Sequence, residues 1–482
     1  MNNEEIINIS MDVEEARKGY ETVGKRLDNI ELGKPINVKL FGAIGDWNGT
    51  SGTDNLPCFK KAVDALPSTG GTILIENGDY WLSDTWTISK SNVRVIVKEN
   101  AILRTTKQTT QGELLCFRGL GTGTTPTIKN NHVSGGGKII STGALDNCIA
   151  FVRCDGCYVE DIIVNAGYKG VTTQEYNNNI IIKDVLVECA NAVGVAIETG
   201  AENVTIKNIA VLSGEKGVTI IGASNAKVKN VVIENIKCKN LLSDGIQISL
   251  CDRAFVDKCI IENNQGRGIS VDNSSDIIIQ NNVLDNIKNI GLNIAKITGC
   301  LSLSNNKIKD ITKTAIAIDS CDIQFIVNNN EVKGNTHLNV VNISSSPNNK
   351  GVFLNNIFEK GIDDIDYSYK GWKPQKISDI YNGMPFEMNY GANKRLYSDK
   401  PPSTGVWEQG DVVINSAPTL ARNISQWVCR IGGSSPSWCA NGIGRGTTTQ
   451  RPADLTPSDI GYCYYDSDLR KVISWNGFGW EI

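Results

Sequence analysis

Three carboxylates and two basic side chains recur near a repeated glycine in the middle of the chain, where they could perform acid–base chemistry on a sugar. Lys216, Asp244 and Arg267 each directly precede that glycine. Glu215 comes one residue earlier than Lys216, and Asp272 follows the glycine of its own repeat by four residues. Cleavage of a glycosidic bond needs two carboxyl groups, about 5 to 5.5 Å apart for retention or about 6.5 to 9.5 Å apart for inversion. We predict that Asp244 acts with Glu215 or Asp272 as the acid and base.

The same stretch carries the predicted substrate-binding residues. Lys216 and Arg267 would hold an acidic or hydroxyl-rich glycan beside the carboxylates. Polar side chains that can hydrogen-bond sugar hydroxyls stand two residues after each glycine, at Thr219, Gln247, Ser270 and Asn293. We predict no metal and no cofactor, because the sequence has only two histidines and no compact acidic cluster.

Two other interpretations of these charges stay open. Lys216, Asp244 and Arg267 could form a surface salt-bridge ladder with no catalytic role. Alternatively, Arg267 with Lys216 could serve a polysaccharide lyase, in which a cation neutralises the carboxylate of a uronic acid and a base removes the α-proton.

A repeat between about residues 179 and 334 must position these side chains. The first and third positions after its small residue are apolar in every copy, which is the pattern of a strand with one buried face. A nearly constant period, with strand alternation and asparagine-rich turns, is typical of a parallel β-helix, whose turns stack at about 4.8 Å. The small residue recurs at Gly194, Gly217, Gly245, Gly268, Gly291 and Ala315.

Two details of the repeat concern its turns. The step from Gly217 to Gly245 is five residues longer than the steps on either side of it, and predicts a loop around residues 238 to 243 that forms a groove wall beside Asp244. Asparagine tolerates the left-handed conformation and can stack through its amide, so we predict amide ladders where asparagines recur. They recur at Asn208, Asn230, Asn282, Asn306 and Asn329.

The segment that precedes the repeat, INVKLFGAIGDWNGTSGTDNLPCFKKAVDAL followed by GGTILIENGDYWL, resembles the N-terminal segment of the pectate-lyase-like superfamily. The match is good in Phe41, Gly42, Ala43, Gly45 and Asp46 and departs in the insert from Trp47 to Thr53. The resemblance implies an all-β fold, a right-handed parallel β-helix, whose first turn is covered by a helix at about residues 55 to 66. The glycines would then serve turns and close packing, and not the binding of a phosphate.

The two ends of the chain resemble tail spikes and tail fibres of bacteriophages. Residues 11 to 31 resemble the N-terminal segment of such proteins from phages and prophages of Gram-positive bacteria, and GVWEQGDVVINSAPTLARNISQWVC and residues 446–482 resemble two small modules frequent in them. Spaced apolar residues in residues 16 to 30 also predict a short coiled coil. The resemblance implies a homotrimer of the virion tail, made in the host cytoplasm and attached to the tail or baseplate through its N-terminal segment. Its partner would be a host surface polysaccharide.

These observations divide the chain into five predicted parts. They are an N-terminal helical segment at residues 1–34, the β-helix with its helix cap at 35–360, a last coil or linker at 361–400, a small β module at 401–445 and a C-terminal β module at 446–482. A receptor-binding fibre without catalysis, or a purely structural tail part, remains an alternative. Aromatic platforms for sugar rings could lie in the C-terminal modules, although core packing is the simpler role, for Trp427, Trp438, Trp475 and Trp480.

Composition excludes several classes of partner. Of 482 residues, 48 are Lys or Arg and 52 are Asp or Glu, so the net charge of −4 favours neither nucleic acid nor an anionic membrane. We expect no export signal and no membrane insertion, because the first residues lack a basic and apolar leader. The 14 cysteines are spread along the chain, mostly within apolar runs, which predicts buried free thiols.

Overall fold

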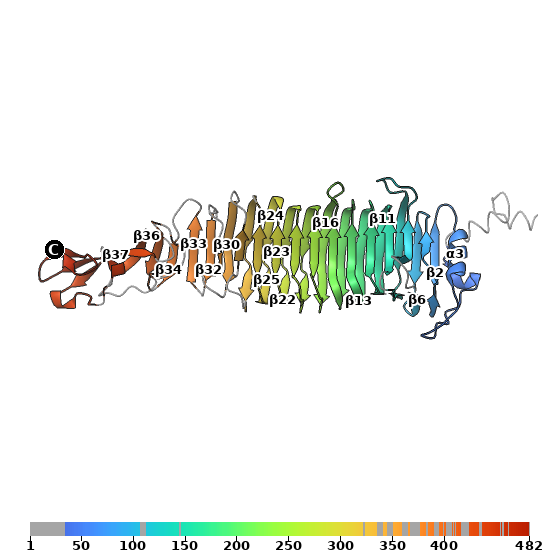
Figure 1. Cartoon of the computed structure of the whole chain (residues 1–482), viewed down its shortest axis with the longest axis horizontal. Coiled ribbons are helices and arrows are strands. Elements are labelled where there is room, and N and C mark those ends of the chain that lie inside the picture. Colours follow the sequence, from blue (N-terminus) through green and yellow to red (C-terminus); the bar gives the residue numbers. More distant parts are fainter. Residues whose placement is uncertain are drawn as a thin grey trace, which may run out of the picture. The chain divides into compact units, whose positions relative to one another are not determined.

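The computed structural model describes residues 34–106, 112–143, 146–321, 323–334, 341–344, 350–358, 365–366, 376–381, 384–389, 395–398, 400–401, 407, 409, 411–415, 424–432, 436–453, 455, 457–460 and 462–481. Stacked parallel strands confirm the predicted β-helix (Figure 1). The chain divides into two compact units, the first ending at Asp252 and the second beginning at Arg253. The predicted N-terminal helical segment lies outside the described residues except for Lys34. Among the residues described, no helix is long and apolar enough to span a membrane.

The first unit begins with a two-residue strand and two short helices and continues as strands. Its elements are β1 (Ile36–Asn37), the 3-10 helix η1 (Val38–Phe41), α3 (Leu56–Asp64), β2 (Gly71–Ile75), β3 (Gly78–Trp81), β4 (Trp86–Ile88), β5 (Val93–Val97), β6 (Ala101–Thr105), β7 (Gly112–Arg118), β8 (Ile128–Ser134), β9 (Lys138–Ser141), β10 (Asp146–Val152), β11 (Cys154–Ala166), β12 (Lys169–Gln174), β13 (Asn178–Glu198), β14 (Glu202–Val211), β15 (Gly214–Ile221), β16 (Val228–Lys239) and β17 (Ile246–Ser249).

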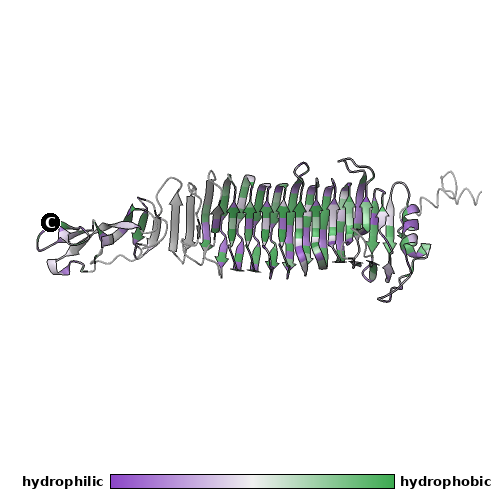
Figure 2. Cartoon of the chain, in the orientation of Figure 1, coloured by the Kyte–Doolittle hydropathy of each residue, from purple (hydrophilic) through white to green (hydrophobic). Residues whose placement is uncertain are grey.

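Inward-facing aliphatic residues hold the turns of this unit together. Val171 aligns with Val195, Val195 with Val218, and Val218 with Ile246, each one turn further along the chain. All four side chains are fully buried, and burying one such side chain contributes about 1.5 to 3 kcal/mol. Figure 2 shows the resulting repeat of hydrophobic residues along the strands. The predicted alternation of buried and outward positions is therefore confirmed.

Helix α3 packs on the first strands as the predicted cap, although it is shorter than expected. The ring of Phe59 is fully buried and meets the rings of Trp86 and Tyr80 at centroid distances of 4.9 and 5.9 Å. Pro57 lies in the first helical turn, where its missing N–H breaks no helical hydrogen bond. A side chain on Gly45 would lie 2.6 Å from the α-carbon of Gly78, so these glycines serve close backbone packing as predicted.

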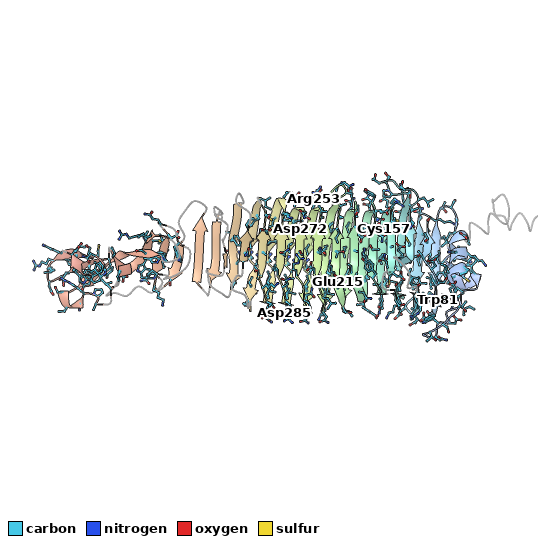
Figure 3. The ribbon with its side chains drawn as sticks, viewed as in Figure 1. Trp81, Cys157, Glu215, Arg253, Asp272 and Asp285 are labelled. Carbon is cyan, nitrogen blue, oxygen red and sulfur yellow. The ribbon has the colours of Figure 1, made fainter. Side chains whose placement is uncertain are left out.

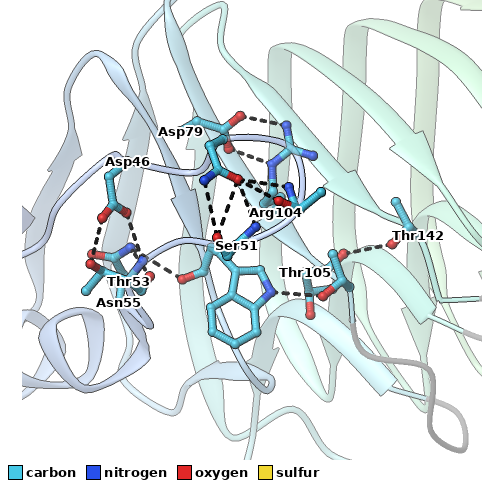
Figure 4. A network of polar contacts seen from close by, with 12 residues as sticks. Asp46, Ser51, Thr53, Asn55, Asp79, Arg104, Thr105 and Thr142 are labelled. Atoms are coloured by element: carbon cyan, nitrogen blue, oxygen red, sulfur yellow. Dashed lines mark hydrogen bonds and ion pairs between the residues drawn. The ribbon is translucent and has the colours of Figure 1, made fainter.

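The insert that begins at Trp47 is tied to the first strands by polar and aromatic contacts (Figure 4). Asp46 accepts hydrogen bonds from the backbone N and the hydroxyl of Thr53 at 2.9 and 2.8 Å. Arg104 makes two hydrogen bonds of 2.6 Å to Asp79 and stands 5.6 Å from the Trp47 ring. The base of the insert is therefore held on the coil, while residues 48–51 are exposed.

The second unit continues with the same kind of strand. Its elements are β18 (Cys251–Asp257), β19 (Ile260–Glu262), β20 (Ile269–Asp272), β21 (Ser275–Gln280), β22 (Val283–Ile287), β23 (Leu292–Ala295), β24 (Thr298–Ser304), β25 (Lys307–Ile311), β26 (Ile316–Asp319), β27 (Gln324–Asn328), β28 (Glu331–Lys333), β29 (Val341–Ser344), β30 (Lys350–Phe358), β31 (Ile365–Asp366), β32 (Lys376–Tyr381), β33 (Met384–Asn389), β34 (Arg395–Ser398), β35 (Val412–Asn415), β36 (Ile424–Ile431), β37 (Ser437–Gly446), η3 (Thr448–Gln450), η4 (Pro457–Asp459), β38 (Cys463–Asp466), β39 (Lys471–Trp475) and β40 (Trp480–Glu481).

Antiparallel pairing replaces the parallel ladder toward the end of the second unit. Strands β35, β36 and β37 pair antiparallel, as do β38, β39 and β40. Trp427 and Trp438 are almost fully buried in this region. These two side chains are therefore core residues, while Trp475 and Trp480 are half-buried and contact each other with ring centroids 5.7 Å apart.

Side-chain amides form the predicted ladders, one buried and others exposed. In the second unit Asn282 donates to Asn306, Asn306 to Asn330 and Asn330 to Asn356, each at 2.9 Å and with all four residues at most 1% exposed. In the first unit the exposed Asn235 donates to Asn208 at 2.8 Å. Positive φ angles are found as expected at Asn208, Asn230 and Asn329. At the buried ladder the residues with positive φ are instead Asn281 and Asn305, which directly precede Asn282 and Asn306.

The expected location of the long repeat step was wrong. Glu198 aligns with Ile221, and Glu202 aligns with Lys229. The segment from Ile221 to Lys229 therefore occupies the same place in its turn as the segment from Glu198 to Glu202 in the turn before. It is four residues longer. These additional residues form a tight turn, Ala223–Ala226, closed by two mutual backbone hydrogen bonds of 3.0 and 2.9 Å.

The remaining additional residue lies beside Asp244. Ser243 N donates to the carbonyl of Glu215, and Gly217 N donates to the carbonyl of Asp244, so Ser243 and Asp244 both lie opposite Lys216 in a β-bulge. Residues 238–243 do not form the predicted loop at a groove wall. The first two of them belong to strand β16, and the side chains of Cys238 and Leu241 are fully buried. Repeat spacing measures the length of an insertion and not its place within the turn.

Replacing Asn306 by Ala should destabilise the second unit. The change removes two side-chain amide contacts of 2.9 Å. It also removes the bond that Asn306 Oδ1 accepts from the buried backbone N of Asn282 and the bond that Asn306 Nδ2 donates to the carbonyl of Ile279, at about 1 to 3 kcal/mol for each buried group left without a partner. We expect a lower free energy of unfolding in urea. The exposed neighbour Lys307, changed to Ala, should leave it within about 0.5 kcal/mol of the parent protein. Equal effects of the two substitutions would contradict a structural role for the amide ladder.

Candidate functional site

The outward face of strands β12, β13, β15 and β17 carries the candidate site of the first unit. Thr172, Ala196, Thr219 and Gln247 align from one turn to the next at the second position after the repeated glycine. They alternate with the inward aliphatic residues and therefore point outward. Although it points outward, Thr219 is only 2% exposed. The predicted substrate-binding residues Thr219 and Gln247 are thus brought together as neighbours one turn apart.

Lys216 and Asp244 flank this row at the start of their strands. Asp244 is 3% exposed and, with Ser243, lies opposite Lys216 in the β-bulge. Lys216 is half-buried, and within the described part of the chain its side chain forms no ion pair or hydrogen bond. A half-buried ammonium group without a partner favours an anionic or hydroxyl-rich ligand.

Glu215 differs from Asp244 in its surroundings. Its side chain is exposed, and Figure 3 marks its place on β15. Because the bulge places Asp244 opposite Lys216, Glu215 is one residue out of register with Asp244. The first unit therefore offers one nearly buried and one exposed carboxylate beside Lys216.

Buried acceptors on the same face have no protein partner. Among the described residues, Gln247 Oε1 and Thr172 Oγ1 are buried and accept no hydrogen bond. Asn147 Oδ1, on β10 of the same sheet, is also buried and accepts no hydrogen bond from the described residues. Buried polar atoms in folded proteins are nearly always satisfied, so such groups need an explanation, and a bound ligand is one.

Earlier turns of this face hold polar residues that the sequence reasoning missed. Lys169 forms an ion pair with Glu198 and stands 5.2 Å from the ring of Tyr168. The signal was present, because Gly170 precedes Gly194 by one ordinary repeat step and extends the repeat toward the N-terminus. We began the repeat at about residue 179 and so left Asn147, Lys169 and Thr172 out of the predicted site.

The second unit holds the other predicted residues. Ser270 aligns with Asn293 one turn later, and the Asn293 amide donates to the Ser270 hydroxyl at 3.2 Å. Asp272 is half-buried and accepts a hydrogen bond from Asn273 (Figure 3). Arg267 is half-buried directly before Gly268. This unit thus brings Ser270 and Asn293 together, while Asp272 aligns with Ala295 and not with another carboxylate.

Comparison with known proteins agrees with the fold. Residues 200–361 match the family described as right handed beta helix region, which makes this a right-handed parallel β-helix. A search of curated protein sequences found no significant match.

Several solved structures are similar to this chain at low identity and with TM-scores below 0.5. An exopolygalacturonase of Thermotoga maritima is 12% identical, with 75% of this chain and 95% of that chain covered and a TM-score of 0.49. The N-terminal fragment of bacteriophage Phi29 gene product 12 is 14% identical, with 78% and 76% covered and a TM-score of 0.48. Tailspike protein 3 of bacteriophage CBA120 is 13% identical, with 96% and 70% covered and a TM-score of 0.37. Similarity at this level concerns the fold and assigns no activity.

Changing Gln247 to Met should not destabilise the unliganded protein. The substitution keeps the length of the side chain but removes the buried Oε1 that lacks a partner, and relieving an unsatisfied polar group is neutral or stabilising by about 1 kcal/mol. Urea unfolding should therefore give an equal or higher free energy of unfolding. A loss of more than about 1 kcal/mol would indicate that the amide is structural.

Proposed function

We propose that this protein binds a bacterial surface polysaccharide along the outward face of its β-helix and hydrolyses its glycosidic bonds there. The observation that carries the proposal is the half-buried ammonium group of Lys216, which within the described part of the chain forms no ion pair or hydrogen bond. An acidic or hydroxyl group of a glycan would accept a hydrogen bond from it. The half-buried side chain of Gln247 lies on the neighbouring row, beside Thr219 one turn away.

The charges beside this row support a catalytic role for Asp244. Asp244 is nearly buried, lies opposite Lys216 in the β-bulge and stands two residues before strand β17. Lys216 opposite it would bind an acidic or hydroxyl group of the glycan. Glu215 or Asp272 would act as the second carboxylate, and Arg267, Ser270 and Asn293 would extend the binding surface in the second unit.

The wider role that we propose is that of a phage or prophage tail spike. It rests on the likeness of the terminal segments to those of tail spikes of phages from Gram-positive bacteria. In that role the chain forms a homotrimer in the virion tail, and its N-terminal segment attaches it to the tail or baseplate. The host glycan is then both the receptor and the substrate.

Changing Asp244 to Asn should abolish cleavage while leaving the glycan bound. We would incubate the protein with capsule and wall glycans of Gram-positive bacteria and measure chain length by size-exclusion chromatography. Loss of one catalytic carboxyl group should lower the rate by at least about a hundredfold. Asp184, an exposed carboxylate with a positive φ angle that Asn tolerates, is the matched control as Asp184→Asn.

Three results would change this proposal. Unchanged cleavage by Asp244→Asn would remove Asp244 from the mechanism. Glycan that sediments with the protein but keeps its length would make the protein a receptor-binding fibre without catalysis. Products that absorb near the ultraviolet edge, as unsaturated uronates do, would indicate a lyase. The half-buried Lys216, which has no partner among the residues that the structure describes, would suit that chemistry.

A further inference from the structure

A pocket of about 400 Å³ lies at a corner of the first unit, away from the sheet face described above. Its volume is within the range of about 300 to 1,000 Å³ typical of small-molecule sites. Two aligned columns of side chains and the segment Thr124–Pro126 line it. The pocket belongs entirely to the first unit, and none of the predicted site residues lines it.

Three successive turns of the coil build the pocket. Asn178 aligns with Glu202, and Glu202 with Lys229. Backbone hydrogen bonds from Tyr176 N to the carbonyl of Thr199, and from Gly200 N to the carbonyl of Ala226, place Tyr176, Gly200 and Lys227 in a second column. The middle turn thus contributes a glycine between an aromatic and a basic residue.

Gly200 allows the ring of Tyr176 to lie across the next turn. A β-carbon at Gly200 would lie only 2.4 Å from Tyr176 Cδ1, so the ring packs directly on the glycine backbone. Glu175 and Tyr176 also have φ angles of 55° and 54°. Left-handed backbone recurs at the corners of this coil, as at Arg153 with a φ of 52° and Leu250 with a φ of 53°. The backbone therefore holds a half-buried aromatic ring at the pocket in a fixed orientation.

The tight turn Ala223–Ala226 supplies the far side of the pocket. This is the insertion that lengthens the repeat step, and it brings Asn225 to the pocket. The Asn225 side chain is exposed and, among the residues described, forms no hydrogen bond. Its amide can therefore both donate to and accept from a ligand hydroxyl.

The charges around the pocket offset one another. Lys229 donates to Glu202 at 2.6 Å, and this hydrogen bond to the carboxylate raises the pKa of Lys229 above its usual value. Lys227 donates to Asp252 at 2.8 Å. Because each ammonium group has a carboxylate partner, the pocket carries no excess positive charge that would select an anion.

We infer that this corner pocket is a second carbohydrate-binding site, specific for a short neutral saccharide that stacks on Tyr176. An aromatic face with amide and paired ionic groups around it matches a sugar ring, which has an apolar face and a rim of hydroxyls. The site goes beyond the proposed cleavage on the sheet face and contains no carboxylate pair dedicated to catalysis. It would hold a chain segment or side branch while the sheet face acts elsewhere on the polymer.

Binding of small neutral sugars to the full-length protein tests this inference. We would titrate maltotriose and tri-N-acetylchitotriose, with trigalacturonate as the anionic comparison, and measure the dissociation constant by calorimetry. We expect the wild type to bind at least one neutral trisaccharide, and Tyr176→Ala to weaken that binding about tenfold. Tyr176→Phe should stay within about twofold of the wild type, because it keeps the stacking face.

A control variant and a second pocket variant keep the test decisive. Tyr158 is another half-buried tyrosine of the first unit that does not line the pocket, and Tyr158→Ala should leave the affinity unchanged. Asn225→Ala alters an exposed side chain, so it should fold normally and still weaken binding severalfold even if Tyr176→Ala is unstable. Failure of both neutral sugars to bind, stronger binding of trigalacturonate, or wild-type affinity in both pocket variants would overturn the inference. Asp244→Asn should leave this binding intact, which separates the pocket from the cleavage proposal.

Discussion

The packing of inward aliphatic residues at one-turn intervals is the constraint on which the rest of the structure depends. The inward side chains that align in successive turns are fully buried, as at Val195, Val218 and Ile246. Backbone pairing between the strands fixes their alignment. A shift by one residue would turn each of them to the solvent. Because the inward positions cannot slip, the outward residue between each pair is also fixed, which is why Thr219 and Gln247 lie side by side. Variation is left to the outward positions and to the corners.

Much of this arrangement could be predicted because it follows from periodicity. The recurring glycines are needed where successive turns approach closely, as a β-carbon on Gly194 would lie 2.7 Å from the carbonyl oxygen of Gly217. Such a requirement leaves a residue-type signal at a constant interval. The asparagine ladders leave the same kind of signal, since the amide of each turn needs an amide in the next.

Features that differ between turns were harder to predict. A period states how many residues a turn contains, but it does not say at which corner extra residues are accommodated. The turn Ala223–Ala226 was therefore expected in the wrong place, and the pocket beside Tyr176 was missed. The bulge at Asp244 is another single-turn feature, and it decides that Lys216, and not Glu215, lies opposite that carboxylate. The burial of outward residues could not be predicted from the sequence either. Thr219 and Ser270 are outward residues, yet their side chains are nearly as inaccessible to solvent as those of the core.

The buried amide ladder of the second unit has a consequence for how such a chain can change in length. Each amide from Asn282 to Asn330 is satisfied by an identical group one turn later along the chain. Deleting a few residues within a strand would bring a different side chain beneath each asparagine. Duplicating or losing one complete coil, in contrast, would leave every amide facing another amide. Evolution can therefore lengthen or shorten this protein in whole coils, while additions of other sizes are accommodated in corner turns or β-bulges.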